Sequence, residues 1–292
     1  MKYKGNKLLL DNFRSVLKGY SVDIQDVVRS AILDDVDVSE YIDSCSPYKL
    51  DQIRLCLKEG ISSSYFVTSG EVLYKLRCMV HDNVDISPIE KYLRASLSDE
   101  HLEYLLSWLK DGVNFSSVNV ATIKKFMLPV YDKGLRWGIN MKKYLKIDSK
   151  RYLELCIQME RQGIDTSVFL RSEWDCSVME FLSRSVSLSV EDWDKIYKYI
   201  GSSDSVYRVQ LLVQMIKNNI DIKPWQATVG TGYKYSSDCL KEVLNAYGEN
   251  MDISEFLKAN SYKEVKDMYA KMKLSKEAKV SGRFVKKQKR EI

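Results

Sequence analysis

The chain has 292 residues, of which 45% are hydrophobic and 29% are charged, so it has enough apolar surface to bury a core and wholesale disorder is excluded. It contains no run of about 18 apolar residues, and its start turns charged before a signal-peptide core develops, so we expect neither a membrane span nor secretion. The formal net charge is +5, and the six cysteines form no CxxC pair, so we expect a cytoplasmic protein with reduced, structural thiols.

A five-residue signature recurs along most of the chain. It consists of Gly, Asn or a similar residue, then an aliphatic, a polar and an apolar residue, and finally Ser, as in NVDIS from Asn83. The copies lie 22 to 34 residues apart, which is typical of a repeat architecture. The nine copies begin at Asp35, Gly60, Asn83, Gly112, Gly138, Gly163, Ser185, Asn219 and Asn250.

Each position of the signature has a physical role at the end of a helix. Gly and Asn most readily adopt the left-handed conformation with which a helix C-terminus satisfies its last carbonyls. The aliphatic residue is expected to fold back onto the helix that has just ended, and Ser is a favoured N-cap for the next helix. The predicted left-handed turn residues are Gly60, Asn83, Gly112, Gly138, Gly163, Asn219 and Asn250.

The repeating unit is predicted to contain a longer helix of about 10 to 14 residues, a tight turn and a short helix of one or two turns. Two residues after the Ser position, eight of the nine copies carry an apolar residue, so the short helix also faces inward. We therefore predict an all-α fold, an α-solenoid of about nine degenerate helix-turn-helix repeats of about 26 residues. It extends over residues 1–270, with a capping helix at residues 1–20. The alternative is an irregular helical bundle in which such C-caps are common.

Two segments carry the signature most clearly, LDQIRLCLKEGISSSYF over residues 50–66 and YLELCIQMERQGIDTSVF over residues 152–169. They resemble a short repeat, roughly QMxEIRxGLExGLDVSxY, of proteins from Firmicutes and from their phages and mobile elements. The resemblance implies a helical array and an origin in a mobile element, and it carries over no catalytic residue. The best-matching positions are Gln52, Ile53, Arg54, Leu57, Gly60 and Ile61.

The clearest interruption of the pattern is residues 223–237, KPWQATVGTGYKYSS. Trp225, Tyr233 and Tyr235 make it a candidate protein-binding loop, because function in a solenoid commonly lies where the repeat is interrupted. The alternative is an ordinary connection in which Trp225 fills the usual apolar position. VGTGYK follows no predicted strand and lacks the Lys-Ser/Thr pair of a phosphate-binding loop. A second interruption, residues 189–205, is expected to insert an extra helix.

No catalytic, metal or cofactor site is predicted, so we expect the protein not to be an enzyme. The two histidines, His81 and His101, are twenty residues apart, and Cys78 with His81 lacks a second ligand pair. Ser-x-x-Lys at Ser15 and Ser46 lacks the companion motifs of a serine acyl-enzyme. The aspartates of the signature have a backbone hydrogen-bonding role in turns.

Residues 271–292 form a basic C-terminal tail, expected to be partly disordered, with nine Lys and Arg against two Glu. The leading hypothesis is a non-enzymatic protein that binds another protein; by the resemblance, it acts in a bacterium or phage-infected host and inhibits a host factor such as a defence nuclease. The alternative is nucleic-acid binding through the tail. No membrane partner is expected. The candidate nucleic-acid-binding residues are Lys286, Lys287, Lys289 and Arg290.

Overall fold

The computed structural model describes residues 17–95, 97–171, 174–185, 188–225, 236–259 and 261–288. Every regular element in these ranges is a helix, so the predicted all-α fold class is confirmed. None of the helices in the described part of the chain is both long and apolar enough to span a bilayer. The chain divides into two compact units, Met1–Lys150 and Arg151–Ile292.

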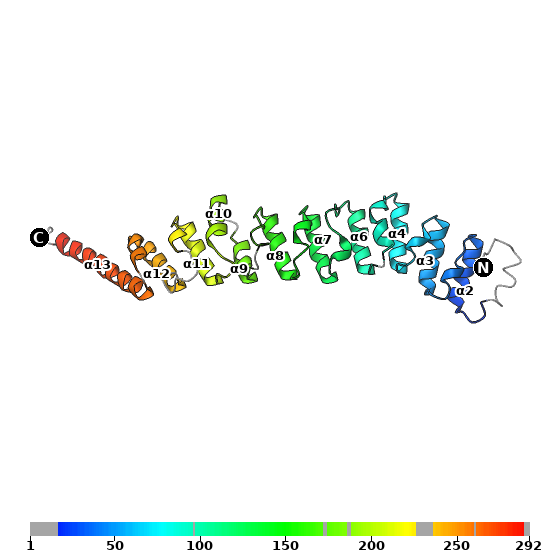
Figure 1. Cartoon of the computed structure of the whole chain (residues 1–292), viewed down its shortest axis with the longest axis horizontal. Helices are drawn as coiled ribbons and strands as arrows, with labels where there is room; N and C mark the ends of the chain where they lie inside the picture. Colours follow the sequence, from blue (N-terminus) through cyan, green and yellow to red (C-terminus); the bar gives the residue numbers. More distant parts are fainter. Residues whose placement is uncertain are drawn as a thin grey trace. The chain divides into compact units, whose positions relative to one another are not determined.

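In the first unit, long helices contact one another in chain order (Figure 1). Helix α2 packs against α3, α3 against α4, α4 against α6, and α6 against α7. The α-helices are α2 (Val22–Leu33), α3 (Pro47–Lys58), α4 (Gly70–His81), α5 (Glu90–Leu93), α6 (Asp99–Lys110) and α7 (Leu128–Arg136). Short 3₁₀ helices lie between them: η1 (Ser39–Tyr41), η2 (Ser63–Tyr65), η3 (Ser87–Ile89), η4 (Val120–Thr122), η5 (Lys125–Met127) and η6 (Met141–Tyr144).

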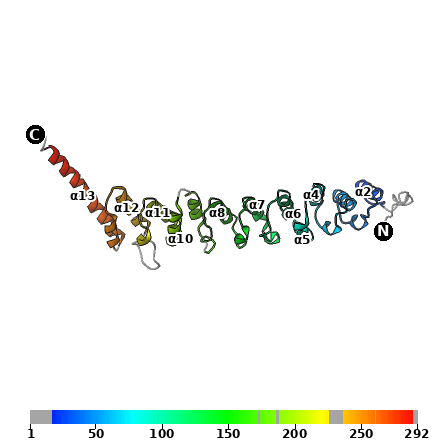
Figure 2. The ribbon, with the colours of Figure 1, turned by 90° about the horizontal axis from the view of Figure 1, so that it is seen from above.

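The second unit is also built from helices that contact near neighbours in the chain. Both α9 and α10 pack against α11, which packs against α12, and α12 packs against α13. Figures 1 and 2 show α13 leading away from α12. The elements are α8 (Lys150–Arg161), α9 (Cys176–Ser183), α10 (Val190–Tyr199), α11 (Val206–Lys217), η7 (Lys223–Trp225), α12 (Ser237–Gly248), η8 (Ile253–Lys258) and α13 (Tyr262–Gln288).

Helix α13 crosses the predicted boundary between domain and tail. It runs without interruption through residues 270 and 271, so the basic C-terminal tail begins inside a helix. Its first turns contact α12, and Val265 is buried there. Every side chain from Lys273 to Ala278 is exposed. The predicted capping helix at residues 1–20 lies almost entirely outside the described residues.

The turn that ends most of the long helices is a Schellman motif, in which two amide groups bond back to the last helical turn. At Gly163, the amide donates to the carbonyl of Glu160 over 2.9 Å, and the amide of Ile164 donates to Met159 over 3.0 Å. Eight signature copies have this pair of bonds and a positive φ at the first residue: Asp35, Gly60, Asn83, Gly112, Gly138, Gly163, Asn219 and Asn250.

The third position of the signature, not the fifth, provides the cap after this turn. The Asp165 carboxylate accepts a hydrogen bond from the backbone amide of Ser167 over 2.8 Å, and the Ser167 hydroxyl donates to the same carboxylate over 2.8 Å. Asn140 and Asp252 bind the amides two residues after them in the same way. The predicted N-cap role of the fifth-position Ser is therefore wrong at Ser167 and Ser254, because the Asp side chain is already within reach of that amide. The copy from Ser185 differs, since Ser189 caps α10 in a capping box with Asp192.

The element after each turn is a 3₁₀ helix of a single turn in most copies, shorter and tighter than the predicted short helix. Its apolar side chain is nevertheless buried as predicted. Phe66, Ile89, Tyr144, Phe169 and Phe256 all have 5% of their surface or less exposed. This short element therefore fixes one large side chain against the long helices.

Five of the long helices begin at a serine that the signature does not include. The Ser46 hydroxyl accepts a hydrogen bond from the amide of Lys49 over 3.3 Å, so the Ser-x-x-Lys at this position is an N-cap. The sequence signal for these caps is a serine, followed by two further residues and then by the apolar positions of a helix. The same cap begins four other long helices, at Ser21, Ser69, Ser205 and Ser236.

One substitution is expected to have opposite effects at two glycines of the second unit. Gly163 has a φ of +80°, whereas Gly248 is the last residue of α12, and a Cβ at either position would meet no atom within 4 Å. Gly163→Ala is expected to lower the free energy of unfolding by about 1 kcal/mol, because an L-residue is strained in the left-handed region. Gly248→Ala is expected to raise it by about 0.5 kcal/mol through helix propensity. Urea denaturation measures both, and two effects of the same sign would contradict the assigned role of Gly163.

Candidate interaction surface

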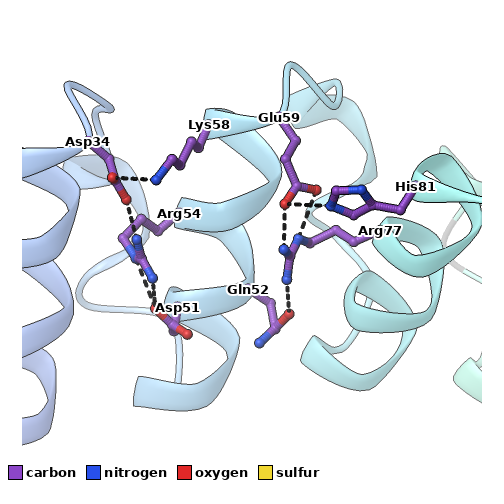
Figure 3. Close-up of polar contacts among 8 residues, drawn as sticks. All are labelled: Asp34, Asp51, Gln52, Arg54, Lys58, Glu59, Arg77 and His81. Atoms are coloured by element: carbon purple, nitrogen blue, oxygen red, sulfur yellow. Dashed lines mark hydrogen bonds and ion pairs between the residues drawn. The ribbon is translucent and has the colours of Figure 1, made fainter.

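Helices α3 and α4 carry two polar clusters near the ends of the long helices (Figure 3). In the first cluster, Asp34, the C-cap of α2, accepts a hydrogen bond from Lys58 over 2.7 Å and forms an ion pair with Arg54. Arg54 also binds Asp51 over 2.8 Å, one turn before it in α3. The arginine is only 14% exposed, so this cluster fixes α2 against α3.

The second cluster repeats this arrangement one helix later. Glu59, the C-cap of α3, binds the guanidinium of Arg77 from α4, whose Nε donates to Glu59 Oε2 over 3.0 Å. Arg77 also donates to the buried Gln52 side chain over 3.1 Å, and His81 Nε2 lies 3.6 Å from Glu59 Oε1. Arg77 therefore joins α4 to α3, because one of its partners, Gln52, lies in α3 and the other, Glu59, is the C-cap of α3.

A third long helix of the first unit also has an acidic C-cap residue that binds an arginine of the next long helix. Asp111, the C-cap of α6, binds Arg136 of α7 over 2.8 Å. An acidic residue directly before the left-handed residue therefore recurs as the anchor for a basic residue of the next long helix. The bidentate geometry of arginine suits this contact better than a lysine would.

These contacts shift the pKa of the acidic partners. The hydrogen bond from Lys58, followed by that from Arg54, lowers the pKa of Asp34 below its usual 3.8, against the opposing effect of burial. The hydrogen bond from Arg77 likewise lowers the pKa of Glu59 below its usual 4.5. Both carboxylates therefore favour the folded state only while they are ionised.

This shift gives a pH-dependent contribution to stability. A carboxylate whose pKa is lower when folded stabilises the protein above its unfolded pKa, and the stabilisation is lost as the pH falls through the folded pKa. Asp34→Asn/Glu59→Gln is expected to lower the free energy of unfolding by about 1 kcal/mol near neutral pH. The free energies of unfolding of the variant and of the wild type, measured from unfolding curves, should converge below about pH 4.5. A gap that stays constant down to pH 3 would contradict this assignment.

Two exposed tyrosines lie beside these clusters, one on each helix. Tyr48 of α3 is 49% exposed and Tyr74 of α4 is 47% exposed. The Tyr48 hydroxyl donates to Glu71 of α4 over 3.3 Å. A hydrogen bond with Cys78, one turn along α4, is the largest cause of the raised pKa of Tyr74. Tyr48, Tyr74 and Cys78 therefore form an exposed surface on α3 and α4, which we call the tyrosine surface.

Glycine at residue 70 allows the tyrosine surface to form. A Cβ at Gly70 would lie 2.9 Å from Cδ1 of Tyr48 and 3.1 Å from the Cα of Lys49. The start of α4 can therefore approach the start of α3 closely only because this residue has no side chain. The sequence signal for the tyrosines is two aromatic residues at polar positions of the helical pattern, which lie outside the repeat signature.

Of the predicted protein-binding residues, only Trp225 lies in the described part of the chain. Its side chain is 3% exposed and its carbonyl accepts a hydrogen bond from Arg208 over 2.7 Å. Trp225 thus fills an apolar core position, the alternative that the sequence allowed, and offers almost no surface to a partner. Tyr233 and Tyr235 lie outside the described residues. So do Lys289, Arg290 and the side chains of Lys286 and Lys287, although the backbone of the latter two belongs to α13.

The histidines and cysteines take structural positions. His101 is buried between the hydroxyl of Ser98 and the carbonyl of Ile123, each 2.7 Å from one ring nitrogen. Cys56, Cys156 and Cys239 are buried, whereas Cys78 is exposed. Among the described residues, no three His, Cys, Asp or Glu side chains are grouped so as to hold a metal ion.

Comparison with known proteins adds no residue roles to this geometry. No family model matches the sequence, and no curated protein or solved structure matches it.

Proposed function

We propose that the chain is an α-solenoid of helix-turn-helix repeats that binds another protein. Eight turns with the same two backbone hydrogen bonds support the repeat architecture, as do long helices that contact their neighbours in chain order. Stacked repeats of this kind use their regular positions for packing, and the residues left exposed on successive helices form an extended binding face.

The tyrosine surface is the observation that carries the proposal. Tyrosine combines a large apolar ring with a polar hydroxyl, and it is enriched among the residues that dominate binding energy at protein interfaces. Tyr48 and Tyr74 come from adjacent helices that are fixed by Arg54 and Arg77. A partner therefore meets rings whose helices are already held in place, so that less conformational entropy is lost on binding.

The class of partner follows from the resemblance of the repeat. Proteins of phages and mobile elements act inside a host cell, so we propose a host factor, for example a defence nuclease, that the chain binds and inhibits. This step rests on analogy with the repeat family and on no contact in the chain.

Affinity capture with matched variants tests the proposal. Wild-type protein, Tyr48→Ala/Tyr74→Ala and the control Val190→Ala/Tyr207→Ala are immobilised and exposed to a Firmicutes lysate, and bound proteins are quantified by mass spectrometry. The control removes two side chains that are 80% and 45% exposed in the second unit. We expect a protein that is retained by wild type and control and lost from the tyrosine variant. Equal retention by all three, or no specifically retained protein, would refute the proposal.

A further inference from the structure

Positive charge is concentrated in one segment of the first unit. Residues 124–150, which we call the basic segment, carry eight Lys and Arg against two Asp. Residues 23–43 carry seven Asp and Glu against one Arg. Their negative charge cancels the positive charge of the basic segment when the net charge of residues 1–270 is summed. The expectation that any attraction for nucleic acid comes from the C-terminal end therefore overlooks a second source within the folded chain.

Both aspartates of the basic segment are already engaged. Asp132 accepts hydrogen bonds from Nε1 of Trp108 and from Nε of Arg136, each over 2.7 Å. Asp148 binds Lys124 over 2.8 Å. The charges of these two aspartates are thus balanced by Arg136 and Lys124, and they do not offset those of Lys125, Lys133, Lys142, Lys146 and Lys150.

These lysines are exposed, and the elements that carry them pack against one another. Within the described residues, none of five lysines has a carboxylate in ion-pair range: Lys125, Lys133, Lys142, Lys146 and Lys150. Helix α7 has nine residues and is therefore about 14 Å long, with η5 directly before it. Met141 of η6 packs against Gly134 of α7, and the Lys124–Asp148 pair joins the two ends of the segment. A single strand carries one phosphate about every 3.4 Å, so lysines spaced over this range can contact different phosphates of the same strand.

An exposed aromatic ring lies among the lysines. Phe126 of η5 follows Lys124 and Lys125 directly and is 52% exposed. Lysine charge alone would suit any polyanion, including an acidic protein. An exposed ring beside it suits unpaired bases, which stack on aromatic side chains whatever their sequence.

We propose that the basic segment binds single-stranded nucleic acid, with the lysines contacting phosphates and Phe126 stacking on a base. This inference is independent of the tyrosine surface, which lies on other helices. It also differs from nucleic-acid binding through the C-terminal tail, which involves other residues.

Binding of a fluorescent oligothymidylate of about 20 nucleotides tests the phosphate contacts. Anisotropy titrations of the full chain compare wild type with Lys125→Gln/Lys142→Gln/Lys146→Gln and with the control Lys263→Gln/Lys266→Gln/Lys271→Gln, three exposed lysines of α13. The first variant is expected to bind at least about tenfold more weakly at low salt. Its slope of log K against log salt should fall by about 2, because a single-strand phosphate contact contributes about 0.7. An equal or larger loss in the control would overturn the proposal, because binding would then not depend on the lysines of the basic segment in particular. Melting curves verify that both variants fold.

Phe126→Ala tests the stacking contact. The oligothymidylate should bind about tenfold more weakly to this variant, and Phe126→Tyr should restore binding, because a tyrosine ring also stacks. A duplex of the same length and an oligoglutamate peptide are expected to bind more weakly than the single strand and to be insensitive to Phe126→Ala. Equal binding of either probe, or no effect of Phe126→Ala on the oligothymidylate, would overturn the assignment to single strands.

Discussion

Replacing Arg208 with alanine is expected to lower the free energy of unfolding by about 3 to 5 kcal/mol, because it leaves a buried charge without its partner. Arg208 lies in the first turn of α11 and is 7% exposed. Its Nε donates to Asp204 over 2.9 Å, and its Nη2 donates to the carbonyl of Trp225 over 2.7 Å. The Asp204 side chain is itself only 12% exposed, so water cannot fully replace the guanidinium. Urea denaturation followed by far-UV circular dichroism measures the loss.

Two further variants separate the buried pair from an ordinary surface contact. Lys75→Ala removes an ion pair with Glu103 in which both side chains are more than 40% exposed, and it should cost less than about 1 kcal/mol. Arg208→Ala/Asp204→Asn should recover part of the loss, because the uncompensated charge is removed together with its partner. A cost for Arg208→Ala as small as that of Lys75→Ala would show that Arg208 is accessible to water.

Trp108→Ala is expected to destabilise the first unit by about 3 to 5 kcal/mol, because the vacated space cannot be refilled completely. The Trp108 side chain is fully buried in α6, with ring centroids 5.9 Å from both Tyr104 and Phe115. Its Nε1 donates to Asp132 of α7 over 2.7 Å. The indole thus joins α6 to α7 by packing and by a hydrogen bond, and urea denaturation again measures the change.

Trp108→Phe distinguishes the two contributions. It keeps most of the ring and removes the donor, while Asp132 retains its hydrogen bond from Arg136. We expect a cost of about 1 to 2 kcal/mol, well below that of alanine. Equal costs for the two substitutions would mean that the hydrogen bond, rather than the packing, accounts for the stability at this position.

The ends of the long helices were predictable because one residue decides each of them. Gly or Asn in the left-handed region fixes the turn locally, and the aliphatic residue after it, such as Ile164, then packs back onto the helix that has just ended. The cap that follows was assigned to the wrong side chain, since Asp165 and Ser167 are both good caps and only the geometry decides between them. The serines before the long helices were overlooked because serine is common throughout the chain.

The surfaces were harder to predict than the turns, because they depend on which helices become neighbours. Tyr48 and Tyr74 are 26 residues apart in the sequence, and only the packing of α3 on α4 brings their helices together. The lysines of residues 124–150 lie in short groups separated by apolar and neutral residues, and only the fold brings the elements that carry these groups together. Trp225 could be read as a partner contact or as core, and only its burial by tertiary packing decides for core.

The Schellman turns also bear on how the chain folds. Each is closed by hydrogen bonds that span at most six residues, so little loop-closure entropy is lost before contacts form. Within each unit, long helices then pack against helices close by in the chain, which keeps the contact order low. Folding of each unit can therefore begin at any of several turns and spread to adjacent helices, and a substitution at one turn should speed unfolding far more than it slows folding.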